Sequence, residues 1–124
     1  MRCPCGSGDT YADCCEPLHA GAAVAPTARV LMASRYAAFA LLDEQYVLAT
    51  WHPSTRPSAL PLEPGLDWVR LEVVEVLGGG PFESTGIVEF RAHYRSASGR
   101  GSIHERSRFL REDGRWFYVD AVDG

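Results

Sequence analysis

The chain has 124 residues, of which 46% are hydrophobic and 23% charged, and its formal net charge at pH 7 is −4. This composition is typical of a folded globular protein and excludes a disordered or fibrous chain. The length allows one ordinary domain, alone or with a small appendage, and excludes two large domains. The negative charge does not favour a nucleic-acid partner.

Apolar stretches in this chain are short. The longest, such as residues 36–42, fall far below the roughly 20 residues that a helix needs to cross a bilayer, so we expect no membrane span. The opening Met-Arg-Cys-Pro lacks the apolar core of a signal peptide. The expected location is therefore the cytoplasm, where thiols stay reduced.

All four cysteines lie within the first fifteen residues, at Cys3, Cys5, Cys14 and Cys15. Disulfides between such close residues would close very small loops and would require an oxidising compartment. A redox pair is typically Cys-x-x-Cys at a helix start, and this spacing does not match it. A metal site is the interpretation that accounts for all four thiols.

Zn²⁺ prefers a tetrahedron of four ligands, and here two cysteine pairs would supply four thiolates. Residues 6–8, Gly-Ser-Gly, follow the first pair and let the backbone fold around a metal with its N–H groups directed at the sulfurs. We expect Asp9, Thr10 or Asp13 to cap a helical turn that carries the second pair. Four protein ligands leave no open position for water, which predicts a structural rather than a catalytic zinc.

The stretch "CPCGSGDTYADCC" resembles the SEC-C motif, the zinc knuckle found at the C-terminus of SecA and in several small bacterial proteins. Its four cysteines match the ligands of that motif. Knuckles of this type are associated with SecB-like or ribosomal partners through a basic surface. The resemblance therefore implies a macromolecular partner, although this chain has Asp9 where the family often has Lys.

Two helices are predicted after the knuckle. Thr27 is placed to cap the first, and Asp43 is placed to cap the second, which ends before Pro53. The first helix carries two adjacent apolar stripes at helical spacing, formed by Leu31, Ala38 and Leu42 and by Met32, Tyr36 and Phe39. Arg35 lies inside the first stripe and is expected to point inward.

From residue 68 onward the pattern changes to period two. Four strands are predicted near residues 68–77, 84–96, 102–112 and 115–122, with turns at residues 78–81, 98–99 and 113–114. Two helices followed by a strand meander predict an α+β fold, with both helices packed on one face of a curved antiparallel four-stranded sheet. We divide the chain into a knuckle, residues 1–20, and a body, residues 24–124.

The last turn predicts a register. If residues 113–114 form a two-residue hairpin loop, Phe109 faces Tyr118 and Ser107 faces Asp120. Alternation then adds Glu105 and Trp116 to this helix-facing side, and places His104, Arg106 and Arg108 on the solvent side. Because Glu105 and Asp120 would be two carboxylates on a core-facing surface, we expect Arg35 to join them in a buried ion-pair network.

The body resembles the YchJ family of uncharacterised bacterial proteins, whose core is a nuclear-transport-factor-2-like (NTF2-like) cone. The likeness rests on "LMASRYAAF", "YVLATWHPSTRP", "HERSRF" and "WFYVDA". A cone of this kind implies a pocket. The residues expected to line it are Arg35, Tyr36, Trp51, Glu105, Ser107, Phe109, Trp116, Tyr118 and Asp120.

Three hypotheses for function follow. The first is a cytosolic zinc-binding adaptor that uses its knuckle to bind a protein partner. The second is an enzyme of the isomerase or dehydratase type, with Glu105 or Asp120 as general base; pairing with Arg35 would lower the pKa of that base and argues against catalysis. The third is association with ribosomes or nucleic acid through outer arginines. The sequence leaves the choice between monomer and dimer open.

Overall fold

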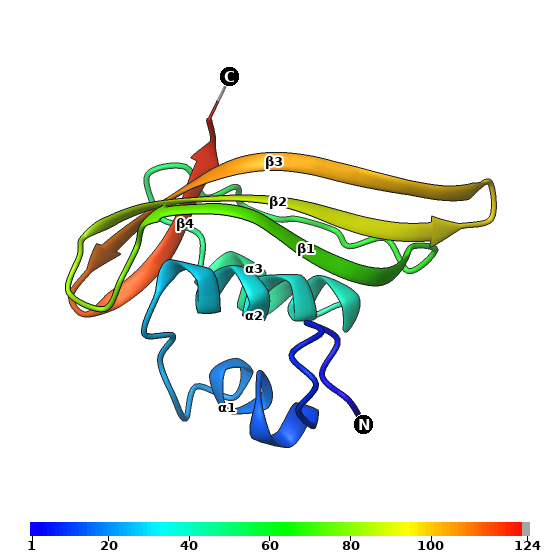
Figure 1. The fold of residues 1–124 in the computed structure, drawn as a ribbon, viewed down its shortest axis with the longest axis horizontal. Helices are drawn as coiled ribbons and strands as arrows, with labels where there is room; N and C mark the ends of the chain where they lie inside the picture. Colours follow the sequence, from blue (N-terminus) through cyan, green and yellow to red (C-terminus); the bar gives the residue numbers. More distant parts are fainter. Residues whose placement is uncertain (123–124) are drawn as a thin grey trace.

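The computed structural model describes residues 1–122, which form three layers (Figure 1). One antiparallel sheet is the first layer, and its strands lie side by side in the order β1 (Asp67–Gly78), β2 (Thr85–Ser96), β3 (Gly99–Glu112) and β4 (Arg115–Ala121). The second layer, against one sheet face, holds α2 (Ala28–Ala40) and α3 (Glu44–Ala49). The third holds the N-terminal segment with η1 (Tyr11–Asp13) and α1 (Glu16–His19). The predicted α+β fold is confirmed.

Helices α2 and α3 both begin at the predicted capping residues. The backbone N–H of Val30 donates to Thr27 Oγ1 at 3.1 Å, and that of Tyr46 donates to Asp43 Oδ1 at 3.1 Å. Each cap satisfies one of the four N–H groups that lack a partner inside a helix. Between the helices, Leu42 adopts a left-handed φ of 58°, which turns the chain sharply enough for α3 to fold back along α2.

Replacing Thr27 by alanine removes the cap of α2. We expect the free energy of unfolding to fall by about 1 kcal/mol, because the Val30 N–H then loses its partner. Thr10→Ala is the matched control, since Thr10 occupies the corresponding position of η1 without a side-chain cap bond. Urea unfolding of the two variants should therefore differ, and equal midpoints would contradict the role of the cap.

The turns between strands follow local sequence signals. Asp113 and Gly114 both adopt positive φ, 53° and 78°, and Glu112 pairs with Arg115 as predicted. At the other end of β3, Ser96 pairs with Gly99, so the loop consists of residues 97–98 rather than 98–99. The third strand therefore begins three residues earlier than predicted.

A β-bulge in the last hairpin changes which side chains face inward. Phe109 pairs with Tyr118 as predicted, but the neighbouring pair is Arg108 with Asp120, which leaves Val119 as an extra residue on β4. The predicted pairing of Ser107 with Asp120 is therefore wrong, because Ser107 lies opposite Ala121. Beyond the bulge, Asp120 lies on the outer face of the sheet.

The free edge of β4 is covered by the segment that follows α3. His52 N–H donates to the Tyr118 carbonyl at 2.7 Å, and Tyr118 N–H donates to the Thr50 carbonyl at 2.9 Å. Trp51 thus forms a parallel bridge with Tyr118. This contact brings the end of α3 to the sheet and holds Trp51 beside the inner face.

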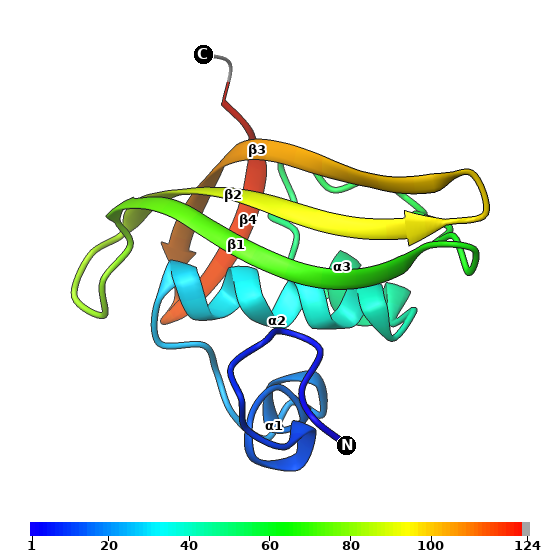
Figure 2. The ribbon, with the colours of Figure 1, turned by 45° about the vertical axis from the view of Figure 1, so that its right-hand side comes forward.

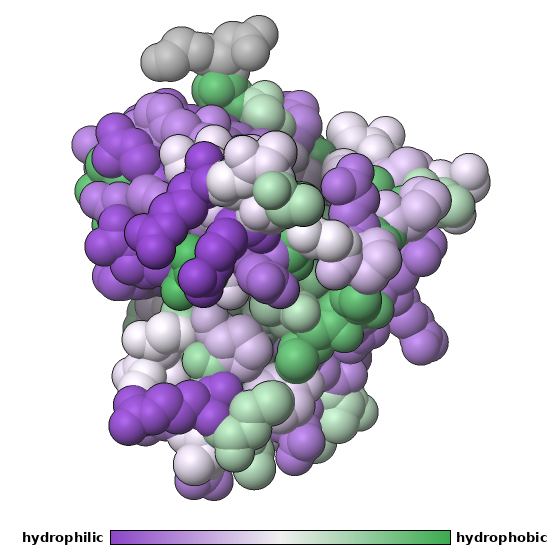
Figure 3. Space-filling model, turned by 90° about the vertical axis from the view of Figure 1, so that its right-hand side faces the viewer, coloured by the Kyte–Doolittle hydropathy of each residue, from purple (hydrophilic) through white to green (hydrophobic). Residues whose placement is uncertain are grey.

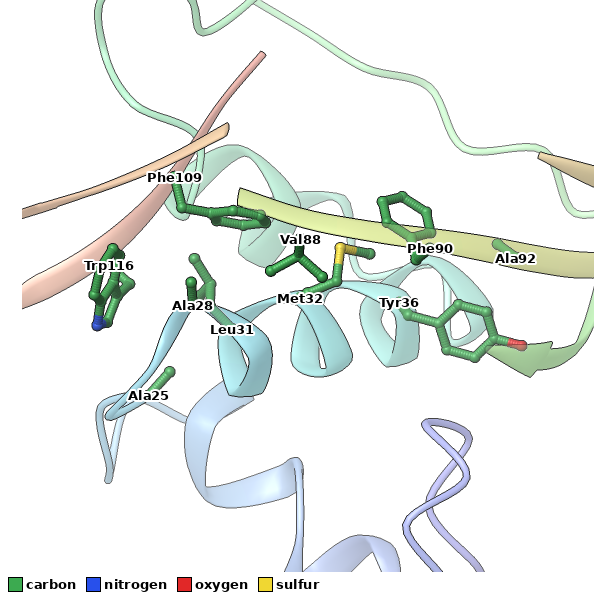
Figure 4. Packing of buried hydrophobic residues seen from close by; sticks show 10 residues of the cluster. All are labelled: Ala25, Ala28, Leu31, Met32, Tyr36, Val88, Phe90, Ala92, Phe109 and Trp116. Atoms are coloured by element: carbon green, nitrogen blue, oxygen red, sulfur yellow. The ribbon is translucent and has the colours of Figure 1, made fainter. Parts of the chain in front are cut away.

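The main core lies between α2 and the inner face of the sheet, as Figure 4 shows. Phe109 and Val88 from the sheet are fully buried, and Leu31 from α2 is 2% exposed. Trp116 closes one end, where its Nε1 donates to the Pro26 carbonyl at 3.3 Å. Apolar side chains thus anchor α2 across the sheet.

The N-terminal segment packs on the side of α2 that faces away from the sheet (Figure 2). Its buried Cys3 and Cys15 contact Ala37, a fully buried residue of α2. Helix α2 is therefore covered on both sides, by the sheet and by the knuckle. Within residues 1–122, no helix has the length and apolar character that crossing a membrane requires.

Candidate functional site

The four cysteine sulfurs converge on one point. Their Sγ atoms all lie within 4.8 Å of one another, with Cys5 and Cys14 at 3.5 Å and Cys14 and Cys15 at 3.9 Å. In a tetrahedron with metal–sulfur bonds of about 2.3 Å, neighbouring sulfurs are about 3.8 Å apart. The thiols thus form a donor set that fits one metal ion.

Short backbone contacts shape this cluster. The first pair lies in a tight turn in which Cys3 N–H donates to the Asp9 carbonyl at 2.9 Å, and Gly6 and Gly8 adopt φ values of 85° and 92° that favour glycine. The second pair lies between η1 and α1. The predicted side-chain caps are absent from both of these helices, where Thr10 and Cys15 hold the cap positions.

Burial gives this site its electrostatic character. Cys15 is 2% exposed, and burial together with the neighbouring sulfurs raises the pKa of its thiol. Four thiolates cannot share such a space without a cation. A bound metal ion would supply that positive charge, and its binding would then be coupled to the folding of the knuckle.

His19 connects the knuckle to the second layer. Its Nε2 donates to the Ser34 carbonyl in α2 at 2.8 Å, so in the neutral ring Nδ1 accepts from the Tyr11 hydroxyl at 2.6 Å. The ring also packs on Tyr46 of α3, with centroids 4.5 Å apart. The Nε2 bond thus holds the knuckle against α2, and the Nδ1 bond lies within the knuckle. Because both ring nitrogens are occupied, the sulfurs are left as the metal donors.

A second candidate site is a cavity of about 260 Å³ between the helices and the inner face of the sheet. Most of its wall is apolar and aromatic, with a polar end. The lining residues are Met32, Arg35, Tyr36, Phe39, Trp51, Leu60, Trp68, Phe90, Ala92, Ile103, Glu105, Ser107 and Tyr118. Among the residues predicted for the pocket, the structure brings six together here: Arg35, Tyr36, Trp51, Glu105, Ser107 and Tyr118.

The other three predicted pocket residues lie elsewhere. Phe109 and Trp116 belong to the main core, nearer the start of α2. Asp120 lies on the outer face because of the bulge, where it accepts two hydrogen bonds from Arg108, at 3.1 Å from Nε and 2.8 Å from Nη2. Asp120 is therefore no candidate base in the cavity, and Glu105 is the carboxylate that lines it.

Arg35 is 3% exposed and makes different contacts from those predicted. Its Nη1 donates to the Val47 carbonyl at 2.8 Å and to Thr50 Oγ1 at 2.7 Å. Its guanidinium carbon lies 4.6 Å from the ring centroid of Tyr118 and 5.4 Å from that of Trp51. Burial lowers the pKa of Arg35 to about 10, which leaves it charged at pH 7.

The predicted ion-pair network is therefore wrong. Among the described residues, no carboxylate oxygen lies within 4.0 Å of the Arg35 guanidinium. Arg35 instead ties α2 to the end of α3 through hydrogen bonds and aromatic faces.

Glu105 is held by hydroxyl groups. Its Oε2 accepts from Ser107 Oγ at 2.5 Å and from the Tyr118 hydroxyl at 3.1 Å. Burial and the adjacent Glu105 raise the pKa of Tyr118, so this hydroxyl keeps its proton. In the part of the chain that the structure describes, Glu105 Oε1 has no hydrogen-bond partner. The carboxylate thus has a free acceptor at the polar end of the cavity.

Several lining residues were missed by the sequence reasoning: Met32, Phe39, Leu60, Trp68, Phe90, Ala92 and Ile103. Period-two alternation along β2 is the signal that could have found Phe90 and Ala92. Trp68 depends on the register of β1 against β2, which contains two irregularities. Nothing local in the sequence fixes that register.

The outer face of the sheet carries mixed charges. Arg106 donates to Glu89 at 3.0 Å, and His104 lies 2.6 Å from the same carboxylate, which lowers the pKa of Glu89. Arg91 lies 3.8 Å from Glu72. Figure 3 shows hydrophilic side chains over much of the part of the molecule where the sheet lies. Acidic residues thus lie between the arginines of this face, so the arginines do not form a continuous basic surface.

Comparison with known proteins identifies both parts of the chain. A model of the SEC-C motif matches residues 2–17, and a model described as "YchJ, middle NTF2-like domain" matches residues 27–121. The chain is 52% identical over 118 residues to a UPF0225 protein of Streptomyces coelicolor, covering 95% of this chain and 92% of the relative. It is 46% identical over 122 residues to a UPF0225 protein of Deinococcus radiodurans, covering 98% and 88%.

Two solved structures share the fold. A SEC-C motif containing protein from Rhodopseudomonas palustris, determined in solution, is 37% identical and superposes with a TM-score of 0.85, covering 100% of this chain and 99% of the other. The crystal structure of a SEC-C motif containing protein from Psychrobacter arcticus is 28% identical, with a TM-score of 0.79, covering 98% and 83%. The likeness therefore extends over the knuckle and the sheet together.

Proposed function

The chain belongs to the YchJ family, and from this premise we propose that it binds a small, mainly apolar molecule in its cavity and holds one structural Zn²⁺ in its knuckle. The observation that carries the first part is the cavity of about 260 Å³, whose aromatic walls end at a free carboxylate oxygen of Glu105. Ligand sites are typically apolar concavities with a few placed polar groups. This cavity has that composition.

Zinc is the metal that best suits the knuckle. Four soft sulfur donors in a tetrahedral arrangement are typical of structural Zn²⁺ sites. The ligand set would be Cys3, Cys5, Cys14 and Cys15, which leaves no position for a substrate. The role of the ion would be to fold residues 1–20, which have little apolar core of their own.

Ethylbenzene is a suitable probe of the cavity. We expect it to shift the indole N–H resonances of Trp51 and Trp68 saturably, and to leave that of Trp116 unchanged, because Trp116 lies in the main core. Ala92→Leu should abolish the shifts by filling the cavity, whereas Ala121→Leu, at an exposed position of the same sheet, should not. Equal shifts at all three tryptophans, or none, would contradict the proposal.

An adaptor role of the knuckle is a second candidate. The turn of residues 6–9 is exposed, and the sulfur cluster beside it would fix its shape. A protein partner of this turn should be retained by the intact chain and lost by a variant in which Cys14 and Cys15 are both serine. Asp9→Lys, which leaves the sulfurs in place, should change the affinity while zinc stays bound. A partner retained equally by all three chains would exclude the turn as its binding site.

A further inference from the structure

The cavity contains two opposite charges that flank one tyrosine. The Arg35 guanidinium lies over the ring of Tyr118, and the hydroxyl of the same Tyr118 donates to Glu105. Arg35 and Glu105 therefore act on the same end of the cavity, although they form no ion pair with each other. Any ligand that reaches this end meets both charges.

This charge balance restricts the ligand. A charged ligand group at this end would lie near both Arg35 and Glu105, so its attraction to one would be offset by its repulsion from the other. The cost of burying that charge in a largely apolar space would then not be compensated. The cavity as a whole is neutral, and it therefore favours a neutral molecule.

The hydrogen-bonding groups set a second restriction. Glu105 Oε2 already accepts two hydrogen bonds, and its Oε1 accepts none from the described residues. Glu105 is only partly buried, and its Oε1 is not among the fully buried polar atoms that lack a partner. A ligand hydroxyl or N–H that donates to this oxygen therefore replaces water and gains a hydrogen bond to a charged group. Recognition at the polar end thus favours a donor on the ligand.

The volume sets a third restriction. A protein cavity of about 150 Å³ holds one benzene molecule, so a cavity of about 260 Å³ holds one ring with substituents, about ten non-hydrogen atoms in all. The ring would lie among aromatic side chains that include Trp68 and Phe90, where offset and edge-to-face contacts are favourable.

Building on the proposed function, we infer that the cavity binds an uncharged single-ring compound whose hydroxyl or N–H group donates a hydrogen bond to the Glu105 carboxylate. This assignment combines the free oxygen of Glu105, the charge of Arg35 and the size of the cavity. The ring fills the apolar part, and the donor reaches the end formed by Glu105, Ser107 and Tyr118.

Four probes of similar size test this assignment: ethylbenzene, 4-ethylphenol, 4-ethylbenzoate and 4-ethylbenzylamine. Titrations followed by the indole resonances of Trp51 and Trp68 give their affinities. We expect 4-ethylphenol to bind about tenfold more tightly than ethylbenzene, since hydrogen bonds to charged groups are the stronger ones. The anionic and the cationic probes should both bind more weakly than the phenol.

The variant Glu105→Gln should reduce the affinity for 4-ethylphenol about tenfold and leave that for ethylbenzene unchanged. Glu89→Gln, the same substitution on the outer face, should change neither affinity. The assignment is overturned if Glu105→Gln leaves the ratio of the affinities for 4-ethylphenol and ethylbenzene unchanged, or if a charged probe binds more tightly than 4-ethylphenol. In either case the cavity remains a binding site. Failure of all four probes to bind overturns the proposed function itself. If Glu105→Gln does not fold, the order of the four affinities for the wild-type chain tests the assignment: 4-ethylphenol must bind most tightly.

Discussion

Replacing Cys14 and Cys15 together by serine is expected to reduce the bound zinc from about one ion per chain to none, because a structural site needs all four of its ligands. Residues 1–20 should then lose their amide protection, while the sheet keeps its own. The knuckle has little apolar core of its own, and its contacts to α2 through Cys15 and Ala37 depend on the folded turn. Elemental analysis and hydrogen exchange followed by NMR measure the two effects.

Asp13→Ser is the matched control for that experiment. It introduces the same side chain at the residue before Cys14, at an exposed position that supplies no sulfur. Zinc content and protection of residues 1–20 should stay as in the wild-type chain. A wild-type chain that copurifies without zinc in chelator-free buffer would refute a structural zinc, and a double variant with a fully protected knuckle would refute the coupling between metal and fold.

Phe109→Ala is expected to cost about 3–5 kcal/mol of the free energy of unfolding, because it leaves a large cavity in the centre of the core. Phe109 is completely buried between α2 and the sheet, and its ring packs edge-on against Tyr118 with centroids 5.9 Å apart. Urea unfolding followed by circular dichroism measures the loss. The zinc content of the folded variant should not change, since the knuckle lies on the far side of α2.

The chain offers a matched control for this substitution as well. Phe82, in the turn between β1 and β2, is 94% exposed, so Phe82→Ala should change the stability by less than about 0.5 kcal/mol. Because both variants remove the same side chain, a difference in their free energies of unfolding reports the effect of burial. Similar losses in both variants would contradict the position of the core described here.

Local signals account for the parts of the fold that the sequence predicts. The caps at Thr27 and Asp43 and the turn at Asp113 depend on residues close in the chain, so each could be recognised without knowledge of the rest. The cysteine cluster was recognisable for a similar reason, because its spacing suits a metal and suits neither a redox motif nor disulfides. The order of helices and strands then fixed the fold class.

Tertiary contacts account for the parts that the sequence did not predict. The inward position and the charge of Arg35 predict carboxylate partners, whereas its partners are a backbone carbonyl at Val47 and a hydroxyl at Thr50. These groups come near Arg35 because the end of α3 is held against β4, a contact with no periodic signature. The lining contributed by Trp68 depended likewise on a strand register that no nearby residue specifies.

The extra residue Val119 in β4 has a further consequence for how this protein can change during evolution. Removing Val119 would restore the regular alternation but would leave Asp120 opposite Arg108, on the outer face, because the register beyond the bulge already sets that pair. Glu105 would remain the carboxylate that lines the polar end of the cavity. The charge of the cavity, and with it the preferred class of ligand, would thus be unchanged by a deletion at this point.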